Sequence, residues 1–413
     1  MAVLDLRSKL AVLADAAKYD ASCASSGTSK RDSIGGKGVG STEGMGICHA
    51  YTPDGRCVSL LKILLTNFCI YDCVYCINRA SSNVQRARFS VDEIVELTLN
   101  FYRRNYIEGL FLSSGIIRSG DYTMEQLVLV AKKLREEHDF RGYIHLKLIP
   151  EADPLLVEEA GLYADRLSAN IELPRDEALK RLAPQKDVGV IKQAMGRVRL
   201  KVEAARPAKK DRAKPPKFAP AGQSTQLIIG ADGASDTEIV DRSASLYAGY
   251  GLRRVYYSAF SPIPDASSAL PLSKPPLMRE HRLYQADWLM RFYGFSPGEI
   301  GDAANDGMLD LAIDPKLAWA LNSRAQFPVD VNTGAREMLL RVPGLGVKSV
   351  NRILQVRRWR TLRLEDIGRL CRGMDKVRPF ITALDWTPGG LTDAADLRAR
   401  MTPVVQPVQL SLF

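Results

Sequence analysis

Residues 60–77 read Leu-Leu-Lys-Ile-Leu-Leu-Thr-Asn-Phe-Cys-Ile-Tyr-Asp-Cys-Val-Tyr-Cys-Ile. The apolar run 60–65 has the length of a buried β-strand, and three cysteines follow it with C-x3-C-x2-C spacing, Cys69, Cys73 and Cys76. Structural zinc sites usually take four protein ligands in paired knuckles, so these three do not complete one. Three cysteines can hold a [4Fe-4S] cluster and leave one iron open to a small molecule. The stretch therefore predicts a strand followed by a cluster-binding loop.

A second interpretation of the cysteines stays open. The three could be structural or free thiols, with a fourth ligand elsewhere in the chain. Cys23, Cys48 and Cys57 lie in or beside a Ser/Gly-rich stretch, residues 22–46, and they could hold a second cluster, shield the first, or pack as small buried residues. Seven cysteines, odd in number and grouped around one motif, favour metal ligation in a reducing cytoplasm over a disulfide framework.

Length and composition describe a globular protein of more than one domain. The chain has 413 residues, of which 46% are hydrophobic and 25% charged. No stretch has the length of a membrane span, and the N-terminal residues lack the layout of a signal peptide. The net charge of +10 suits a polyanionic partner.

Strand and helix patterns alternate after the cysteines. Apolar runs beginning near residues 60, 109, 142, 166, 226 and 254 predict six strands, and residues 91–102, 123–137 and 155–163 carry helical spacing between them. This alternation indicates an α/β fold with a parallel sheet and crossover helices. Such sheets place ligands at the C-terminal ends of their strands, which is where the cysteine loop falls.

The cysteine motif, with Tyr75 directly before its last cysteine, resembles the radical S-adenosylmethionine (radical SAM) superfamily. The resemblance implies a partial (β/α)6 barrel, a [4Fe-4S] cluster on Cys69, Cys73 and Cys76, and SAM chelated to the open iron. It also implies an electron donor and cleavage of SAM to a 5′-deoxyadenosyl radical. The bound cofactors would supply the chemistry, and the barrel would orient and shield it.

Two groups of residues at strand ends are candidate SAM contacts, together with Tyr75. Ser113, Ser114 and Gly115 follow the second strand, where the family has a glycine-rich turn, although this chain has serines in place of the first glycines. Ser168, Asn170 and Glu172 alternate along the fourth strand, so we expect all three to project to one face, where a ribose or carboxylate would satisfy them. Weaker candidates by the same logic are Lys147, Glu151, Gln223, Thr225 and Gln226.

Residues 335–356 resemble a helix-hairpin-helix motif, with helical patterns on either side of Pro343-Gly344-Leu345-Gly346. Two glycines let the backbone approach a phosphate, and the N-terminus of the second helix points free N–H groups there. The candidate nucleic-acid contacts are Gly344, Gly346, Lys348, Arg352, Arg357, Arg358 and Arg360, with Arg363, Arg369 and Arg372 as further cations. Contacts of this kind are independent of base sequence. A generic helical hairpin is the alternative.

The C-terminal residues Gln409, Leu410, Ser411, Leu412 and Phe413 resemble the peptide with which bacterial polymerases and repair proteins bind the DNA sliding clamp. A glutamine and a Leu-Phe anchor can fill a preformed groove when an extended segment precedes them. Packing of this apolar end on its own domain is the alternative. The clamp interpretation predicts a sliding-clamp partner for Gln409, Leu410, Leu412 and Phe413.

These patterns divide the chain into four segments. Residues 1–58 carry an N-terminal helix and the Gly/Ser/Cys-bearing loop, and residues 59–265 form the radical SAM core, with a basic, mobile insertion at 197–220. Residues 266–395 form a helical domain that contains the hairpin, and residues 396–413 form a flexible tail. A loop over a phosphate backbone and a solvated loop are equally compatible with the insertion.

The combination resembles a radical SAM family of DNA modification or repair proteins with a C-terminal helix-hairpin-helix domain. It implies an enzyme that abstracts hydrogen from a nucleotide in DNA, flipped or already unpaired. A partner similar to uracil-DNA glycosylases is implied by the resemblance alone. Two alternatives remain: an RNA- or tRNA-modifying radical SAM enzyme, since phosphate contacts do not distinguish the polymers, and a non-catalytic Fe-S DNA-binding protein.

Overall fold

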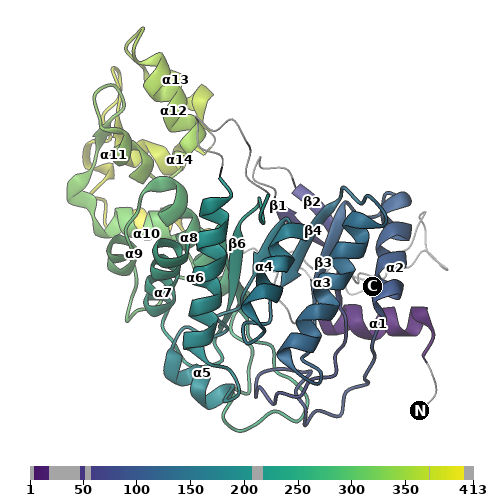
Figure 1. The fold of residues 1–413 in the computed structure, drawn as a ribbon. Coiled ribbons are helices and arrows are strands. Elements are labelled where there is room, and N and C mark those ends of the chain that lie inside the picture. The colour runs from purple at the N-terminus through teal and green to yellow at the C-terminus, as the bar shows by residue number, and fades with distance from the viewer. Residues whose placement is uncertain (1–3, 18–46, 52–56, 207–216, 372, 404–413) are drawn as a thin grey trace, which may run out of the picture. The chain divides into compact units, whose positions relative to one another are not determined.

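The computed structural model describes residues 4–17, 47–51, 57–206, 217–371 and 373–403 (Figure 1). The chain divides into two compact units. The first comprises residues 1–234 and 245–276, and the second comprises residues 235–244 and 277–413. Among the described residues, no helix is both long enough and apolar enough to cross a membrane.

The first unit is built on a seven-stranded sheet in the order β1 to β7. Strands β2 to β7 are parallel and neighbour one another in chain order, as in a partial (β/α)6 barrel. The six predicted strands are all present. Strand β1, which was not predicted, pairs antiparallel with β2 at the edge of the sheet. The strands are β1 (Ile47–Tyr51), β2 (Cys57–Leu64), β3 (Gly109–Ser113), β4 (Tyr143–Lys147), β5 (Arg166–Ser168), β6 (Gln223–Ile229) and β7 (Arg254–Ala259).

Helices connect the parallel strands. Helix α2 begins with a capping box in which Ser90 and Glu93 each bind the other's backbone N–H, and its apolar face is buried through Ile94, Val95 and Leu97. Helix α4 begins with Asp153 as its N-cap and a proline in its first turn. The helices are α1 (Leu6–Ala17), α2 (Val91–Arg103), α3 (Gly120–Glu136), α4 (Pro154–Tyr163), α5 (Asp176–Leu182), α6 (Val188–Ala204) and α7 (Asp236–Tyr250).

The core of the first unit lies along the strands, whose side chains are almost all buried. Every residue of β3 is buried, as expected for a parallel sheet that is covered on both faces. Cys48 packs in a buried cluster with Val58, Leu60 and Phe111, which agrees with the interpretation of this cysteine as a packing residue. Cys57 is exposed, and Cys23 lies outside the described residues.

Two boundaries differ from the sequence analysis. Helix α6 continues to Ala204, so the first part of the predicted basic insertion is helical, with Val198 buried in the core. At the other end, Phe218 is buried against the Gly161 position of α4, so the chain is packed again before residue 220. Both boundaries are set by single apolar side chains within the basic stretch. Their burial stabilises an ordered backbone although the surrounding residues are mostly charged.

The second unit is mostly helical. Its apolar centre contains Trp319, Phe327 and Phe380, whose rings pack edge to face at centroid separations of 6.1 and 5.0 Å. Two short parallel strands, β8 (Val329–Asp330) and β9 (Ile381–Thr382), pair beside it. The helices are α8 (Leu277–Trp288), a π-helical turn (Leu289–Tyr293), α9 (Pro297–Asp302), α10 (Pro315–Asn322), α11 (Arg336–Arg341), α12 (Val347–Val356), α13 (Leu364–Leu370), α14 (Met374–Val377) and α15 (Leu397–Met401), with 3-10 turns at Arg324–Gln326, Arg378–Phe380 and Gly389–Leu391.

Candidate functional site

The cysteine loop leaves the C-terminal end of β2, as predicted. Cys69 Sγ accepts hydrogen bonds of 3.4 Å from the backbone N–H groups of Tyr71 and Ile116. The Cys76 N–H donates to the Cys73 carbonyl at 2.9 Å, which closes a turn between the last two cysteines. The loop is therefore a defined structure that brings three thiols to one strand end.

The side chain of Arg86 binds the backbone of this loop. Its guanidinium donates hydrogen bonds to four backbone carbonyls, of Asn67, Asn78, Arg79 and Ser82, with distances of 2.9, 2.6 and 2.9 Å to the last three. A guanidinium carries five N–H donors in a rigid plane, so one side chain can hold several carbonyls of a loop together. The sequence analysis did not identify Arg86, because the C-x3-C-x2-C spacing says nothing about what supports the loop.

The Ser113-Ser114-Gly115 turn lies directly against the cysteine loop. The Gly115 N–H donates to the Thr66 carbonyl at 2.8 Å, and the Ile70 N–H donates to the Ile116 carbonyl at 2.8 Å. A Cβ atom at Gly115 would lie 2.2 Å from the Phe68 carbonyl oxygen, so only glycine fits this contact. The structure thus brings together two groups of predicted site residues that are more than thirty positions apart in the chain.

Cys73 is buried, and Cys69 and Cys76 are partly exposed. Burial raises the pKa of the Cys73 thiol and raises the pKa of Cys76 to about 12. Iron binds the thiolate, so assembly of a cluster would release these protons. Among the residues that the structure describes, no three His, Cys, Asp or Glu side chains are placed to hold a single metal ion. The thiols of a cubane bind different irons, so a cluster does not need them to converge on one point.

The polar residues after β5 differ from the prediction. Strand β5 ends at Ser168, and Glu172 adopts a left-handed backbone with φ of 66°, so the expected alternation does not continue along the whole segment. All three side chains are buried, and each has a protein partner. Ser168 Oγ lies 3.0 Å from His145 Nε2, Asn170 Nδ2 donates to Gln226 Oε1 at 3.1 Å, and Glu172 contacts Lys186. Each of these three side chains is therefore paired within the protein.

Lys186 is a residue that the sequence analysis missed. Its Nζ lies 2.5 Å from Glu172 Oε1, and the side chains are 20% and 7% exposed. Lys186 stands in the turn between α5 and α6, fourteen residues after its partner. No periodicity or motif marks a lone lysine in such a turn, so only the folded chain shows this contact.

Two buried polar atoms near this ion pair have no hydrogen-bond partner within the described part of the chain, Tyr75 Oη and Glu151 Oε1. Burial raises the pKa of both side chains, and the charges of Glu172 and Lys186 act on both. Buried polar atoms are rarely left without a partner, and a bound ligand is one explanation where they are. A donor and an acceptor next to the cysteine loop fit a small polar molecule such as SAM, which carries amino, carboxylate and hydroxyl groups.

The weaker candidates on β6 have structural contacts. Gln223 Nε2 donates to the carbonyls of Met195 and Tyr250, and Thr225 Oγ1 accepts a hydrogen bond of 2.9 Å from the Ile171 N–H. These bonds tie β6 to its neighbours. The polar side chains that suggested ligand contacts here are polar because they satisfy buried hydrogen bonds within the protein.

In the second unit, α11 and α12 flank the Pro343-Gly344-Leu345-Gly346 turn. Gly344 has φ of 83°, and a Cβ atom there would lie 2.7 Å from Val377 Cγ2. Gly346 is the N-cap of α12 and supplies no side-chain cap. Lys348, in the first turn of α12, is exposed. Two helices around a glycine turn fit both interpretations of the sequence, a helix-hairpin-helix motif and a generic helical hairpin.

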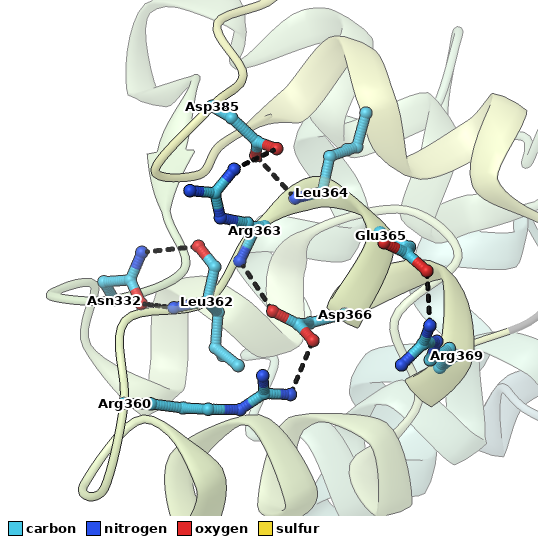
Figure 2. Close-up of polar contacts among 9 residues, drawn as sticks. All are labelled: Asn332, Arg360, Leu362, Arg363, Leu364, Glu365, Asp366, Arg369 and Asp385. Carbon is cyan, nitrogen blue, oxygen red and sulfur yellow. Dashed lines mark hydrogen bonds and ion pairs between the residues drawn. The ribbon is translucent and has the colours of Figure 1, made fainter.

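The predicted cations fall into two groups. Arg357 donates to the carbonyls of Val331 and Gly334, and Arg360 contacts Asp366 at 2.6 Å (Figure 2), so both have internal roles. Figure 2 also shows Arg363 beside Asp385 and Arg369 beside Glu365. Of the predicted contacts, the exposed side chains with no ion pair or hydrogen bond to described residues are Lys348, Arg352 and Arg358.

Trp359, which was not among the predicted site residues, is 86% exposed between Arg358 and Arg360.

A cavity of about 360 Å³ lies elsewhere in the same unit, and Lys316 forms part of its wall. Lys316 Nζ donates to the Leu345 carbonyl of the hairpin turn at 2.6 Å, and burial lowers its pKa to about 7. The cavity is lined by Tyr284, Gln285, Trp288, Leu289, Tyr293, Asp314, Pro315 and Lys316.

Residues 63–203 match the family model of the radical SAM superfamily. No curated protein matches the chain. Solved structures that align with part of the chain include the FeFe-hydrogenase maturase HydG from Carboxydothermus hydrogenoformans, at 16% identity and a TM-score of 0.42 over 55% of this chain and 50% of that one. Methylornithine synthase (PylB) aligns at 14% identity and a TM-score of 0.41 over 55% and 60% of the two chains.

A third similar structure is SuiB from Streptococcus suis bound to S-adenosylmethionine, at 10% identity and a TM-score of 0.39 over 55% of this chain and 47% of that one. The chain thus covers about half of the length of these solved structures. The family match covers the cysteine motif, the Ser113 turn and the polar residues after β5. Residues 63–203 thus carry the sequence features of the radical SAM superfamily, whose cofactors are a [4Fe-4S] cluster and SAM.

Proposed function

We propose that the chain is a radical SAM enzyme that acts on DNA, as a base-modifying or repair activity. The first unit would hold the cofactors and the second would bind the sugar-phosphate backbone. The observation that carries the DNA part is the hairpin of α11 and α12, with its glycine turn and three exposed cations, Lys348, Arg352 and Arg358.

The N-terminus of α12 suits a phosphate oxygen. No side chain caps this ten-residue helix, so its first N–H groups are available to an anion, and the positive end of the helix dipole favours one. Gly344 and Gly346 have no side chains to block the approach. Lys348 carries its charge in the same turn. A cation at a helix N-terminus is unfavourable by itself and becomes favourable when a phosphate binds there.

The end of α12 offers a second kind of contact. Trp359 is 86% exposed and follows Arg358, which is also exposed. Aromatic side chains stack on nucleobases with little dependence on sequence, at about 1–3 kcal/mol per base, and arginine adds phosphate contacts. An exposed indole beside exposed cations, just after α12, supports binding to single-stranded nucleic acid with accessible bases.

In the first unit, Cys69, Cys73 and Cys76 would hold the cluster, and the amino and carboxylate groups of SAM would take the open iron. When bound, these cofactors would supply radical chemistry for hydrogen abstraction from the substrate. Arg86 and the Gly115 contact keep the loop in place. Tyr75 Oη and Glu151 Oε1 would orient the polar groups of SAM, and the buried sides of Ser113, Ser168 and Asn170 exclude water from the strand ends.

The remaining partners belong to the same proposal. The Gln409–Phe413 segment lies outside the described residues, and its sequence supports docking to the DNA sliding clamp. An electron donor is required by the cofactor chemistry. A glycosylase-like partner rests on the family resemblance alone.

Nucleic-acid binding is tested by fluorescence anisotropy under anaerobic conditions, with labelled DNA and RNA of the same sequence, single- and double-stranded. We expect binding that weakens with salt, and a decrease of about 1 in the slope of log K against log salt for Lys348→Gln or Arg358→Gln. Arg400→Gln is the matched control, because Arg400 pairs with Asp396 on α15. Salt-independent binding would exclude phosphate contacts, and preference for RNA would replace DNA with RNA as the substrate.

A further inference from the structure

The turn that carries Lys186 is attached to the cysteine loop. The Val74 N–H, between Cys73 and Cys76, donates a hydrogen bond of 2.7 Å to the Leu182 carbonyl at the end of α5. The Lys186 N–H then donates to the Ala183 carbonyl at 2.9 Å, which closes the turn. Lys186 therefore has a fixed position relative to the two last cysteines.

The carboxylate that meets Lys186 is fixed as well. The Glu172 N–H donates to the Gln226 carbonyl at 3.1 Å, and the Glu172 carbonyl accepts from the Ile228 N–H at 2.7 Å. Glu172 has φ of 66°, a conformation that costs a non-glycine residue about 1–3 kcal/mol and that tends to persist at functional sites. Both partners of the ion pair are thus held by the backbone.

Burial of the Glu172–Lys186 pair is unfavourable, and the charges of the pair act on the nearby thiols. Glu172 is 6% exposed, and removing two charges from water usually costs more than their attraction returns. Burial opposes the charge on Lys186, but the Glu172 carboxylate raises the pKa of Lys186 well above its usual range, so the ammonium persists. For Cys73, Lys186 acts more strongly than Glu172, and in the opposite direction. The bond from the Val74 N–H to the Leu182 carbonyl places the turn that carries this ammonium beside the cysteine loop.

We propose that Lys186 is a positioning residue that sets the reduction potential of the cluster on Cys69, Cys73 and Cys76, with Glu172 as its counterion. A fixed ammonium beside the cysteine loop stabilises the electron that the cluster accepts in a one-electron reduction. Net charge around a cluster is one of the main determinants of its potential. The proposal concerns the cofactor site alone and does not depend on whether the substrate is DNA.

Each partner of the pair has a different predicted effect on the potential. Lys186→Met removes the ammonium and leaves the Glu172 carboxylate, so the potential shifts to a more negative value. Glu172→Gln leaves the ammonium without its counterion, so the potential shifts to a more positive value. The double variant removes both charges and lies between the single variants. Lys186→Arg keeps the positive charge and stays near the wild type.

The experiment is an anaerobic redox titration of the reconstituted full chain without SAM, with titanium(III) citrate as the reductant, followed by the EPR signal of the reduced cluster. Iron and sulfide content are measured for every variant. Lys192→Met is the matched control, since Lys192 pairs with Asp176 at 3.1 Å in the same unit and should leave the potential unchanged.

Opposite shifts for Lys186→Met and Glu172→Gln at full iron content support the proposal. Unchanged potentials in both variants, or shifts of the same sign, would overturn it, because loss of a purely structural contact does not depend on the sign of the charge that is removed. If Lys186→Met fails to take up iron, Glu172→Gln decides alone: a more positive potential supports the proposal and an unchanged or more negative one overturns it.

Discussion

Arg86 Nη1 donates a hydrogen bond of 2.9 Å to the carbonyl oxygen of Asn78, two residues after the last cysteine of the loop. The same guanidinium binds three further carbonyls, before and after the cysteines. One side chain therefore joins the two ends of the cysteine loop. A loop held in this way keeps its three thiols in place before any iron arrives.

Replacement of Arg86 by methionine should remove most of the cluster. Each buried carbonyl that loses its donor costs about 1–3 kcal/mol, so the loop should lose its structure while the sheet remains folded. Iron content and the visible absorbance of the reconstituted protein measure the loss. Arg103→Met is the control, because Arg103 is exposed on α2. Full iron content in Arg86→Met would show that the cysteines alone hold the loop.

Gly115→Ala should have a similar effect through a steric route. The new methyl group would lie 2.2 Å from the Phe68 carbonyl oxygen, so either the Ser113 turn or the cysteine loop must move. We expect reduced iron content and weaker SAM binding by calorimetry. The control is Gly196→Ala in α6, where a Cβ meets no atom within 4 Å and should stabilise the helix by about 0.5–1 kcal/mol. Equal behaviour of the two variants would contradict the assigned contact.

The sequence predicted the six parallel strands because their apolar runs and spacing are local features. It also predicted that the Ser113 turn and the cysteine loop share a strand end, since parallel strands order their C-terminal ends together. The contact from the Ile116 N–H to Cys69 Sγ, at 3.4 Å, agrees with that expectation.

Other parts of the site had no local signal. Arg86 acts through backbone carbonyls 4 to 19 residues before it, and Lys186 acts through Glu172. A single arginine or lysine in a loop resembles any solvated one in the sequence. The alternation over 168–172 was wrong beyond Ser168, because the left-handed backbone of Glu172 interrupts it. The sequence predicted more cations available for phosphate than the structure provides, because Arg357 and Arg360 bind groups of their own unit.

Arg357 and Arg358 are adjacent but differ in their contacts, so their substitutions should have different effects. Arg357→Met should destabilise the second unit, because the carbonyls of Val331 and Gly334 lose their donor, at about 1–3 kcal/mol. Arg358→Met should leave stability unchanged, since Arg358 is exposed, and should weaken DNA binding. Urea unfolding and anisotropy measure the two properties. The reverse pattern would mean that Arg357 is the residue that contacts the phosphate.

Lys316 gives the second unit a predicted pH dependence. Its pKa is about 7 in the folded chain and about 10.4 when unfolded, so between these values the unfolded chain binds one more proton. Stability should therefore rise with pH above about 7, by up to about 1.4 kcal/mol per unit. All four tryptophans lie in the second unit, so tryptophan fluorescence during urea unfolding reports on it.

The variant Lys316→Met should remove this rise. Methionine keeps most of the side-chain volume and has no titratable group, so its unfolding free energy should vary less between pH 7 and pH 9 than that of the wild type. Comparison of the two slopes cancels the other titrating groups. Parallel pH profiles would contradict burial of a lysine at this position.

The proposed function requires that the cysteine loop support radical chemistry on DNA. The direct test incubates reduced, reconstituted protein with SAM and uniformly deuterated DNA, damaged or undamaged, and analyses the 5′-deoxyadenosine by mass spectrometry. We predict 5′-deoxyadenosine that carries deuterium from DNA, and no product above background for the Cys69→Ala, Cys73→Ala or Cys76→Ala variants. Absence of 5′-deoxyadenosine at full iron content would contradict the radical SAM activity, and product without deuterium from any DNA would contradict DNA as its substrate.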